Sequence, residues 1–191
     1  MTSLHLLRHG RTQGPQGFRG RLDVPLSDEG WNQMHSATSA LSYDRIVTSP
    51  LQRCAKFARA LAETTGIAMF VEADLRELDF GDWEGRTPAE LMVDQAEALG
   101  QFWADPYGYT PPSGEPVQAF EQRVLNAVES LVDRFTGERL LVITHGGVIR
   151  LLLARARGLH RNDLLQVEVG YAECHSIQTE RRGEILWLGE T

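Results

Sequence analysis

The segment LHLLRHG, residues 4–10, is an apolar run that ends in an arginine, a histidine and a glycine. A short apolar run that stops at a glycine is typical of a buried strand followed by a turn. Because an unpaired charge is costly to bury, Arg8 at the end of such a strand should face an anion. The alternative is that Arg8 reaches solvent and His9 is an ordinary loop histidine.

A second segment, RLLVITHGG at residues 139–147, repeats the pattern of a buried strand followed by a histidine and glycines. Strand and helix patterns alternate along the rest of the chain. This alternation favours an α/β fold, a three-layer α/β/α sandwich with a mostly parallel central sheet. The tail is expected to add antiparallel strands at one edge. Further strands are expected at 45–49, 69–72, 164–170, 174–180 and 184–189.

Two serines and a regular spacing of apolar residues predict the helices. Ser27 is expected to cap one helix, and Ser49-Pro50 has the pattern of an N-cap and first helical position of another. That second helix is expected to run to about Glu63. Further helices are expected at residues 88–103, 117–135 and 148–158.

The composition is that of a single globular domain, 1–191, with a substantial core. The 19 basic and 26 acidic residues argue against general nucleic-acid binding, but not against a small anion held by a few arginines. Cys54 and Cys174 have neither disulfide-scaffold nor zinc-finger spacing. Neither a secretory signal nor the ~20-residue apolar run of a membrane span is present. We therefore expect a cytoplasmic protein without a membrane partner, and a homodimer is compatible with the sequence.

Candidate functional residues gather at the predicted strand ends. In α/β sheets ligands bind outside the carboxyl ends of the strands, and His9 and His145 follow two of them. Arg8 adjoins the first histidine, and Arg53 lies in the first turn of a helix, where free N–H groups favour anions. Together these four side chains favour a pocket for a phosphate-sized anion. Candidate general acids lie in the irregular stretch 73–87, namely Glu77, Asp79, Asp82 and Glu84.

A metal site is the competing interpretation of two histidines. The sequence contains no HxxxH, HxH or HExxH spacing, and an arginine beside the histidines would repel a cation. A Walker A loop and a GxGxxG motif are also absent, so nothing favours a nucleotide cofactor. We therefore expect neither a metal nor a cofactor.

Five blocks of the sequence resemble the histidine phosphatase superfamily, the phosphoglycerate-mutase-like group. The blocks are LLRHGRT (6–12), GRLDVPLSDEG (20–30), SPLQRCAKFA (49–58), LRELDFGDWEG (75–85) and VITHGGVIR (142–150). They occur in the order typical of the family and cover most of the chain. The resemblance implies a phosphoglycerate-mutase-like fold and a metal-independent hydrolase of phosphoric monoesters.

The resemblance also implies a role for each matching residue. His9 corresponds to the nucleophile that becomes a phosphohistidine, and Glu77 to the proton donor for the leaving oxygen. A neutral imidazole can attack in line, and its ordinary pKa of ~6.5 keeps a useful fraction neutral at pH 7. The resemblance predicts a phosphate-binding set of Arg8, Gly10, Thr12, Arg53, His145 and Gly146.

The stretches 108–124 and 164–177 are most similar to α-ribazole phosphatases. This similarity implies that the small phosphorylated substrate is α-ribazole 5′-phosphate, a nucleotide of cobalamin biosynthesis. The alternatives within the family are a broad-specificity sugar or nucleotide phosphatase and a phosphoglycerate mutase. A non-catalytic phospho-ligand binding module is the alternative from another class, and the presence of both histidines and of Glu77 weighs against it.

Some positions near the motifs leave alternatives open. Gly14-Pro15 stands where the family often has an asparagine near the phosphate. Trp83 and Trp103 belong either to the core or to the pocket. Glu115 is expected to position a helix or a pocket residue, whereas Asp79, Asp82 and Glu84 are expected either to organise a loop or to be solvated.

Overall fold

The computed structural model describes residues 1–182 and 185–190, which form a six-stranded sheet in the order β3-β2-β4-β1-β5-β6. The first four strands of this order are parallel, and β5 pairs antiparallel with both β1 and β6. The predicted α/β class, with antiparallel strands added at one edge, is therefore confirmed. The strands are β1 (Thr2–Arg8), β2 (Arg45–Thr48), β3 (Met69–Val71), β4 (Arg139–Thr144), β5 (Cys174–Arg182) and β6 (Ile185–Glu190).

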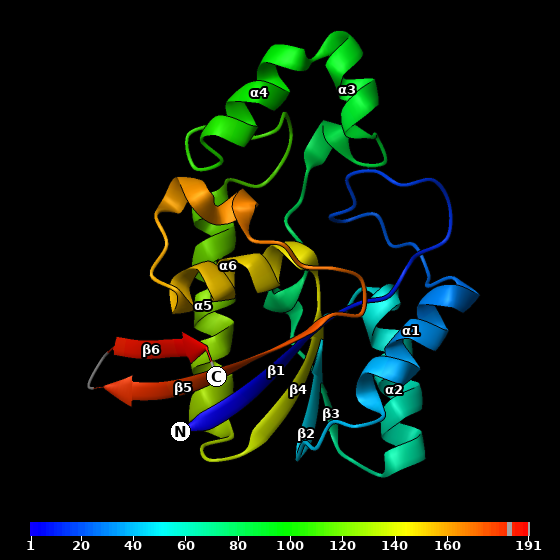
Figure 1. Cartoon of the computed structure of the whole chain (residues 1–191), viewed down its shortest axis with the longest axis vertical. Helices are drawn as coiled ribbons and strands as arrows, with labels where there is room; N and C mark the ends of the chain where they lie inside the picture. Colours follow the sequence, from blue (N-terminus) through cyan, green and yellow to red (C-terminus); the bar gives the residue numbers. More distant parts are fainter. Residues whose placement is uncertain (183–184, 191) are drawn as a thin grey trace.

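Helices cover both faces of the sheet, α1 and α2 on one side and α5 and α6 on the other (Figure 1). In the same view α3 and α4 lie beyond the carboxyl ends of the parallel strands. The α-helices are α1 (Asp28–Thr38), α2 (Gln52–Thr65), α3 (Pro88–Asp94), α4 (Ala96–Ala104), α5 (Val117–Arg134) and α6 (Gly146–Ala156). Three short 3-10 helices are η1 (Ala73–Leu75), η2 (Gly81–Trp83) and η3 (Arg161–Gln166). Across residues 1–182 and 185–190, the helices lack the combination of length and apolar character that a membrane crossing requires.

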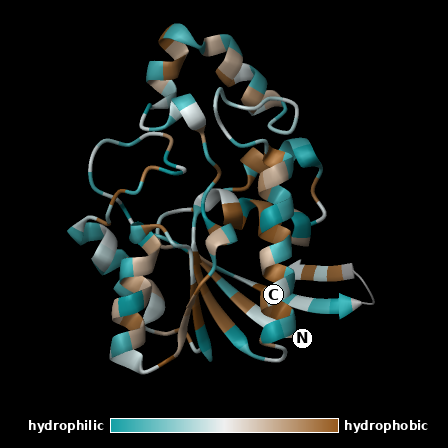
Figure 2. Ribbon diagram, turned by 180° about the vertical axis from the view of Figure 1, so that it is seen from behind, coloured by the Kyte–Doolittle hydropathy of each residue, from teal (hydrophilic) through white to brown (hydrophobic). Residues whose placement is uncertain are grey.

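The apolar run of β1 is buried because both faces of the strand are covered. Leu4 and Leu6 belong to the core under α5 and α6, whereas Leu7 belongs to the core under α1 and α2. In Figure 2 the central strands are largely brown, and the helices around them mix teal, white and brown residues. A near-continuous hydrophobic run is what a parallel strand needs when it is buried on both faces.

The register of the parallel strands brings their carboxyl ends to one level. Arg8 of β1 stands opposite Thr144 of β4, and Thr48 of β2 stands opposite Ile143. The backbone N–H of His9 continues the ladder by donating to the carbonyl of Thr144 at 3.0 Å. Consequently the residues that follow β1, β2 and β4 meet at one edge of the sheet.

Two details of the sequence-based expectation are wrong. Ser49-Pro50 does not start a helix, because α2 begins at Gln52 and the Ser49 side chain turns to a histidine of the site. The segment 164–170 is not a strand, since its first residues belong to η3. Beyond η3 the carbonyls of Val167 and Val169 accept hydrogen bonds from arginine side chains instead of a neighbouring strand.

The other elements agree with expectation, apart from one helix that is divided in two. Ser27 caps α1 by accepting a hydrogen bond from the N–H of Gly30, and α2 ends at Gly66 in the left-handed conformation. The expected helix over 88–103 is divided into α3 and α4 at Gln95, which is not helical. The expected strand 184–189 corresponds to β6, although its first residue lies outside the described residues.

Two glycines allow the turn after β1 to cross the first turn of α1. A side chain on Gly10 would overlap with the backbone of Gly30, and one on Gly30 would overlap with the carbonyl of Arg11. We expect Gly30→Ala to lower the free energy of unfolding by about 1–3 kcal/mol, the usual effect of overpacking. Gly100 of α4 is the matched control, because nothing lies within 4 Å of the position that a Cβ atom would take there. Gly100→Ala should stabilise by about 0.5–1 kcal/mol, and urea unfolding of both variants checks the pair.

Candidate active site

His9 follows β1 at the carboxyl edge of the sheet and is 7% exposed. Its Nδ1 lies 2.8 Å from the carbonyl oxygen of Gly10. A carbonyl only accepts hydrogen bonds, so in the neutral ring Nδ1 carries the proton and Nε2 keeps its lone pair. The turn thus supplies a nucleophilic nitrogen in a fixed tautomer.

Burial, followed by the positive charge of Arg53, lowers the pKa of His9 to about 3. The hydrogen bond to Gly10 opposes this change, and the charges of Arg8 and Arg19 add to it. The ring is therefore neutral at pH 7, the state in which an imidazole nitrogen is nucleophilic.

The guanidinium group of Arg8 lies between the tail of the chain and the start of α6. It donates from one terminal nitrogen to the carbonyl of Val169 at 2.6 Å, and its central carbon lies 4.2 Å from the centre of the Tyr171 ring. A side chain on Gly146 would approach the Arg8 Nε at 3.3 Å, so the glycine permits this arrangement. Arg8 is held from two sides while its Nε remains without a partner.

Arg53 is completely buried, and it binds the loop 19–22 that follows the motif LLRHGRT (6–12). Its terminal nitrogens donate to the carbonyls of Leu22 at 2.7 Å, Gly20 at 2.8 Å and Arg19 at 3.1 Å. The loop is held from the other side by Glu84, whose carboxylate accepts the backbone N–H groups of residues 20–22. Glu84 thus organises this loop, one of the two alternatives that the sequence left open.

His145 follows β4, and its ring meets that of His9 edge to face with the centroids 5.3 Å apart. Its Nε2 lies 2.6 Å from the Ser49 hydroxyl, which already accepts the N–H of Leu51. In the tautomer that carries the ring proton on Nδ1, the hydroxyl donates to Nε2. Burial, then the charge of Arg53, lowers the pKa of His145 well below its usual value, so this ring is neutral too.

Buried side-chain nitrogens without a hydrogen-bond partner fall into two groups among the described residues. Two of them, in Arg45 and His175, still lie within 3.2 Å of a carboxylate oxygen. The remaining three are Nε of Arg8, Nε of Arg53 and Nδ1 of His145. Buried donors almost always have partners. Three unpaired nitrogens near the imidazole of His9 therefore indicate an anion site.

Glu77 lies in the irregular segment after η1, where its carboxylate faces the start of α6. One oxygen accepts the N–H of Gly147 at 3.0 Å and the other accepts the N–H of Leu78 at 3.0 Å. A side chain on Gly147 would overlap with the carboxylate, so the second glycine of the THGG motif permits the approach. Of the four candidate acids, Glu77 is the one that contacts the helix beginning after His145.

A cavity of about 400 Å³ opens beside Glu77. Its wall includes Arg150, which donates from Nε to the carbonyl of Val167 at 2.9 Å. Trp103 is 47% exposed and lines the cavity, whereas Trp83 is fully buried and belongs to the core. The aromatic part of the wall is formed by Phe18, Phe80, Phe102, Trp103 and Phe120.

The structure brings the predicted residues Arg8, His9, Arg53 and His145 together, with Glu77 beside them at the cavity. Thr12 lies in the same turn, and its hydroxyl accepts a hydrogen bond from Arg19. Gly14-Pro15 belongs to the same loop, where the carbonyl of Pro15 also accepts from Arg19.

Sequence reasoning missed three contributors to the site, namely Arg19, Ser49 and Tyr171. The family block around Ser49 gave a signal for that residue, but it was interpreted as a cap. Nothing in the local pattern distinguishes Arg19 or Tyr171 from other loop residues. For metals, residues 1–182 and 185–190 contain no cluster of three or more His, Cys, Asp or Glu side chains able to hold an ion.

The chain is similar in sequence to a known protein family and to named members of other organisms. The model of the histidine phosphatase superfamily (branch 1) matches residues 4–189. The adenosylcobalamin/α-ribazole phosphatase of Salmonella typhimurium is 33% identical over 158 residues, which cover 80% of this chain and 78% of that protein.

Solved structures agree with the sequence relatives. YhfR of Bacillus stearothermophilus has a TM-score of 0.85 and 31% identity, covering 94% of this chain and 92% of that one. A mycobacterial glucosyl-3-phosphoglycerate phosphatase in complex with inorganic phosphate has a TM-score of 0.84 and 27% identity. That alignment covers 99% of this chain and 95% of the mycobacterial chain.

The depressed pKa of His9 predicts a ring that does not titrate in the neutral range. In the folded, ligand-free protein the chemical shift of the His9 Cε1–H proton should stay constant from pH 8 to pH 5, because the pKa of the ring is about 3. Proton NMR, with the resonance assigned through His9→Ala, measures this directly. In urea the same ring should titrate near ~6.5. A midpoint near that value in the folded protein would contradict the buried, cation-flanked environment.

Proposed function

Because this chain belongs to branch 1 of the histidine phosphatase superfamily, we propose that it hydrolyses phosphate monoesters through a phosphohistidine on His9. The family membership, a hydrolase activity and the fold follow from the comparisons. The resemblance noted in the five sequence blocks is thereby confirmed. The observation that carries the assignment to His9 is its neutral imidazole beside three unpaired nitrogens of Arg8, Arg53 and His145.

In the first step, the lone pair of His9 Nε2 attacks phosphorus while the bond to the leaving oxygen breaks. Protonated Glu77 gives its proton to that oxygen, so an alcohol departs. Arg8 and Arg53 stabilise the charge on the phosphoryl oxygens, and His145 adds a neutral donor from Nδ1. The N–H of His9 Nδ1 stays hydrogen-bonded to the Gly10 carbonyl, which orients the ring throughout.

In the second step, water attacks the phosphorus of the phosphohistidine and the phosphorus–nitrogen bond breaks. The Glu77 carboxylate takes a proton from the attacking water, which returns the acid to its starting form. Inorganic phosphate leaves and His9 regains its neutral ring. The mycobacterial relative has been solved with inorganic phosphate, which supports phosphate as a ligand of this type of site.

The test of the proposed function is the covalent intermediate. We expect His9→Ala to abolish turnover of p-nitrophenyl phosphate, because no other group there replaces the nucleophile. Rapid quenching with labelled substrate should trap acid-labile, base-stable phosphate on the wild-type protein and none on the variant. His35→Ala, at an exposed histidine of α1, is the control and should keep both activity and trapping. Activity of the wild type should persist in EDTA. Turnover by His9→Ala within tenfold of wild type would refute the assignment.

For the substrate, we propose α-ribazole 5′-phosphate. The cavity beside Glu77 supports this choice, because its aromatic wall can stack against a flat, apolar base. The Salmonella typhimurium relative carries the name adenosylcobalamin/α-ribazole phosphatase and matches 80% of this chain. Cleavage would release α-ribazole into the cavity and leave the phosphoryl group on His9.

A phosphorylated sugar acid is the second candidate, and Arg150 is the observation that favours it. This guanidinium lies in the wall of an otherwise largely apolar cavity and suits a carboxylate. The mycobacterial glucosyl-3-phosphoglycerate phosphatase is a structural relative with this class of substrate in its name.

Trp103 distinguishes the two candidates. If the aromatic wall binds the base, Trp103→Ala should lower kcat/KM for α-ribazole 5′-phosphate by roughly five- to tenfold, the usual value of an aromatic contact. The effect on glycerol phosphate should be less than twofold. Val93→Ala is the control, since Val93 is an 87% exposed apolar residue of the neighbouring helix and does not line the cavity. A higher kcat/KM for glucosyl-3-phosphoglycerate than for α-ribazole 5′-phosphate would reverse the order of the candidates.

A further inference from the structure

Glu77 lies in a segment whose position does not come from regular secondary structure. The 3-10 helix η1 ends at Leu75, and the next short helix, η2, begins only at Gly81. A general acid has to stay within hydrogen-bond reach of the leaving oxygen. The segment therefore needs tertiary contacts to hold it in place.

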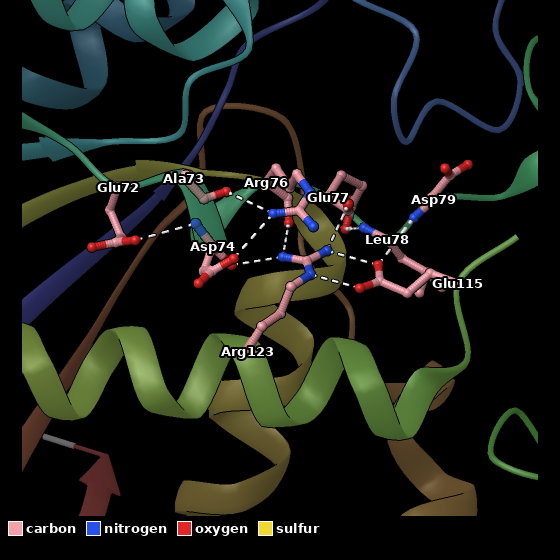
Figure 3. A network of polar contacts seen from close by, with 9 residues as sticks. All are labelled: Glu72, Ala73, Asp74, Arg76, Glu77, Leu78, Asp79, Glu115 and Arg123. Carbon is pink, nitrogen blue, oxygen red and sulfur yellow. Dashed lines mark hydrogen bonds and ion pairs between the residues drawn. The ribbon is translucent and has the colours of Figure 1, made fainter.

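One arginine of α5 supplies most of these contacts (Figure 3). The terminal nitrogens of Arg123 donate to the carbonyls of Asp74 at 2.6 Å, Arg76 at 2.8 Å and Glu77 at 3.0 Å. Its two other N–H groups donate to the carboxylate of Glu115, at 2.7 and 2.8 Å. All five N–H donors of a guanidinium are thus used, and three of them hold the backbone that carries Glu77.

Glu115 completes the arrangement from the chain that precedes α5. Its backbone N–H donates to the carbonyl of Asp79 at 2.9 Å, and one carboxylate oxygen accepts the N–H of Asp79 at 3.4 Å. The side chains of Arg123 and Glu115 are only 10% and 15% exposed. Because the pair is shielded from water, its electrostatic attraction is weakly screened and its geometry is well defined.

Within the segment 74–77, the carbonyl of Leu75 is the one that Arg123 does not bind, and it is held from the opposite side. Leu75 accepts a hydrogen bond from the hydroxyl of Thr144 at 2.8 Å, and Thr144 immediately precedes His145. The segment is thereby tied to α5 on one side and to the end of β4 on the other. The position of Glu77 relative to the phosphate pocket is set by these two attachments.

We propose that Arg123 and Glu115 are positioning residues that hold the Glu77 carboxyl at the leaving oxygen. This inference rests on the proposed function, in which Glu77 protonates that oxygen. Arginine is required because a lysine has a single ammonium centre and cannot hold the Glu115 carboxylate and three separate carbonyls. The pair touches no reacting atom and acts only through Glu77.

The leaving group provides a readout that a merely structural role would not change. Benzyl phosphate and p-nitrophenyl phosphate are similar in size, but only the benzyl alkoxide is a poor leaving group that depends on protonation. We expect Arg123→Lys and Glu115→Gln each to lower kcat/KM for benzyl phosphate about tenfold or more. For p-nitrophenyl phosphate the loss should stay below threefold. The same selectivity should appear, more strongly, in Glu77→Gln.

A double variant tests whether the pair acts through Glu77. In the Glu77→Gln background, Arg123→Lys should change kcat/KM for benzyl phosphate by less than twofold, because residues that act as one unit are not additive. Arg181→Lys is the matched control, since Arg181 forms a comparable two-bond pair with Asp133 of α5. It should leave both substrates unaffected. Activity toward p-nitrophenyl phosphate in each sample reports that the variant is folded.

The outcomes separate this inference from the proposed function. A wild-type protein that hydrolyses neither phosphate would refute the proposed function itself. Equal losses on both substrates for Arg123→Lys and Glu115→Gln, with selectivity kept by Glu77→Gln, would overturn only the positioning role. A full additional loss in the double variant would do the same.

Discussion

The buried guanidinium of Arg53 is the interaction on which the organisation of the site depends. It carries a positive charge in the interior, and its terminal nitrogens are satisfied by carbonyls of the loop 19–22. Glu84 holds the N–H groups of the same loop from the other side. The guanidinium of Arg53 and the carboxylate of Glu84 therefore fix the irregular loop 19–22, which belongs to no helix or strand. Burial lowers the pKa of both His9 and His145, and the charge of Arg53 lowers both further, so one guanidinium contributes to the loop geometry and to the protonation state of the histidines.

This arrangement ties the chemistry to the pH dependence of folding. The pKa of His9 is about 3 in the folded protein and 6.5 ordinarily, and that of His145 is also lowered. Between these values the unfolded chain binds protons that the folded chain does not. The folded state therefore loses stability as the pH falls through 6.5 and below. Keeping two imidazoles neutral in the folded state makes the fold more sensitive to acid.

The sequence was sufficient to predict an element or the place of a site residue wherever a local pattern determines it. Buried apolar runs that end in His9 and His145 predicted parallel strands, and the carboxyl ends of such strands meet by register. The split at Gln95 and the 3-10 helix in place of strand 164–170 were missed, because tertiary contacts decide between these conformations. Ser49 was missed as a partner of His145 for the same reason, since 96 residues separate them. The contacts of Arg123 were not predicted, because the carbonyls that it binds belong to a segment almost 50 residues earlier in the chain, such as Asp74, 49 residues away.

Part of the aromatic wall of the cavity comes from a helix that contributes none of the residues Arg8, His9, Arg53 and His145. Phe102 and Trp103 belong to α4, beyond the strand ends, whereas His9 and His145 continue β1 and β4. Substitutions at separate, non-contacting sites usually have additive effects. Under the proposed function, changes in α4 would therefore alter which alcohol is released while His9 stays unchanged. Such a division makes the fold readily adaptable by evolution, and it marks α4 as the segment to vary when new substrate preferences are sought in the laboratory.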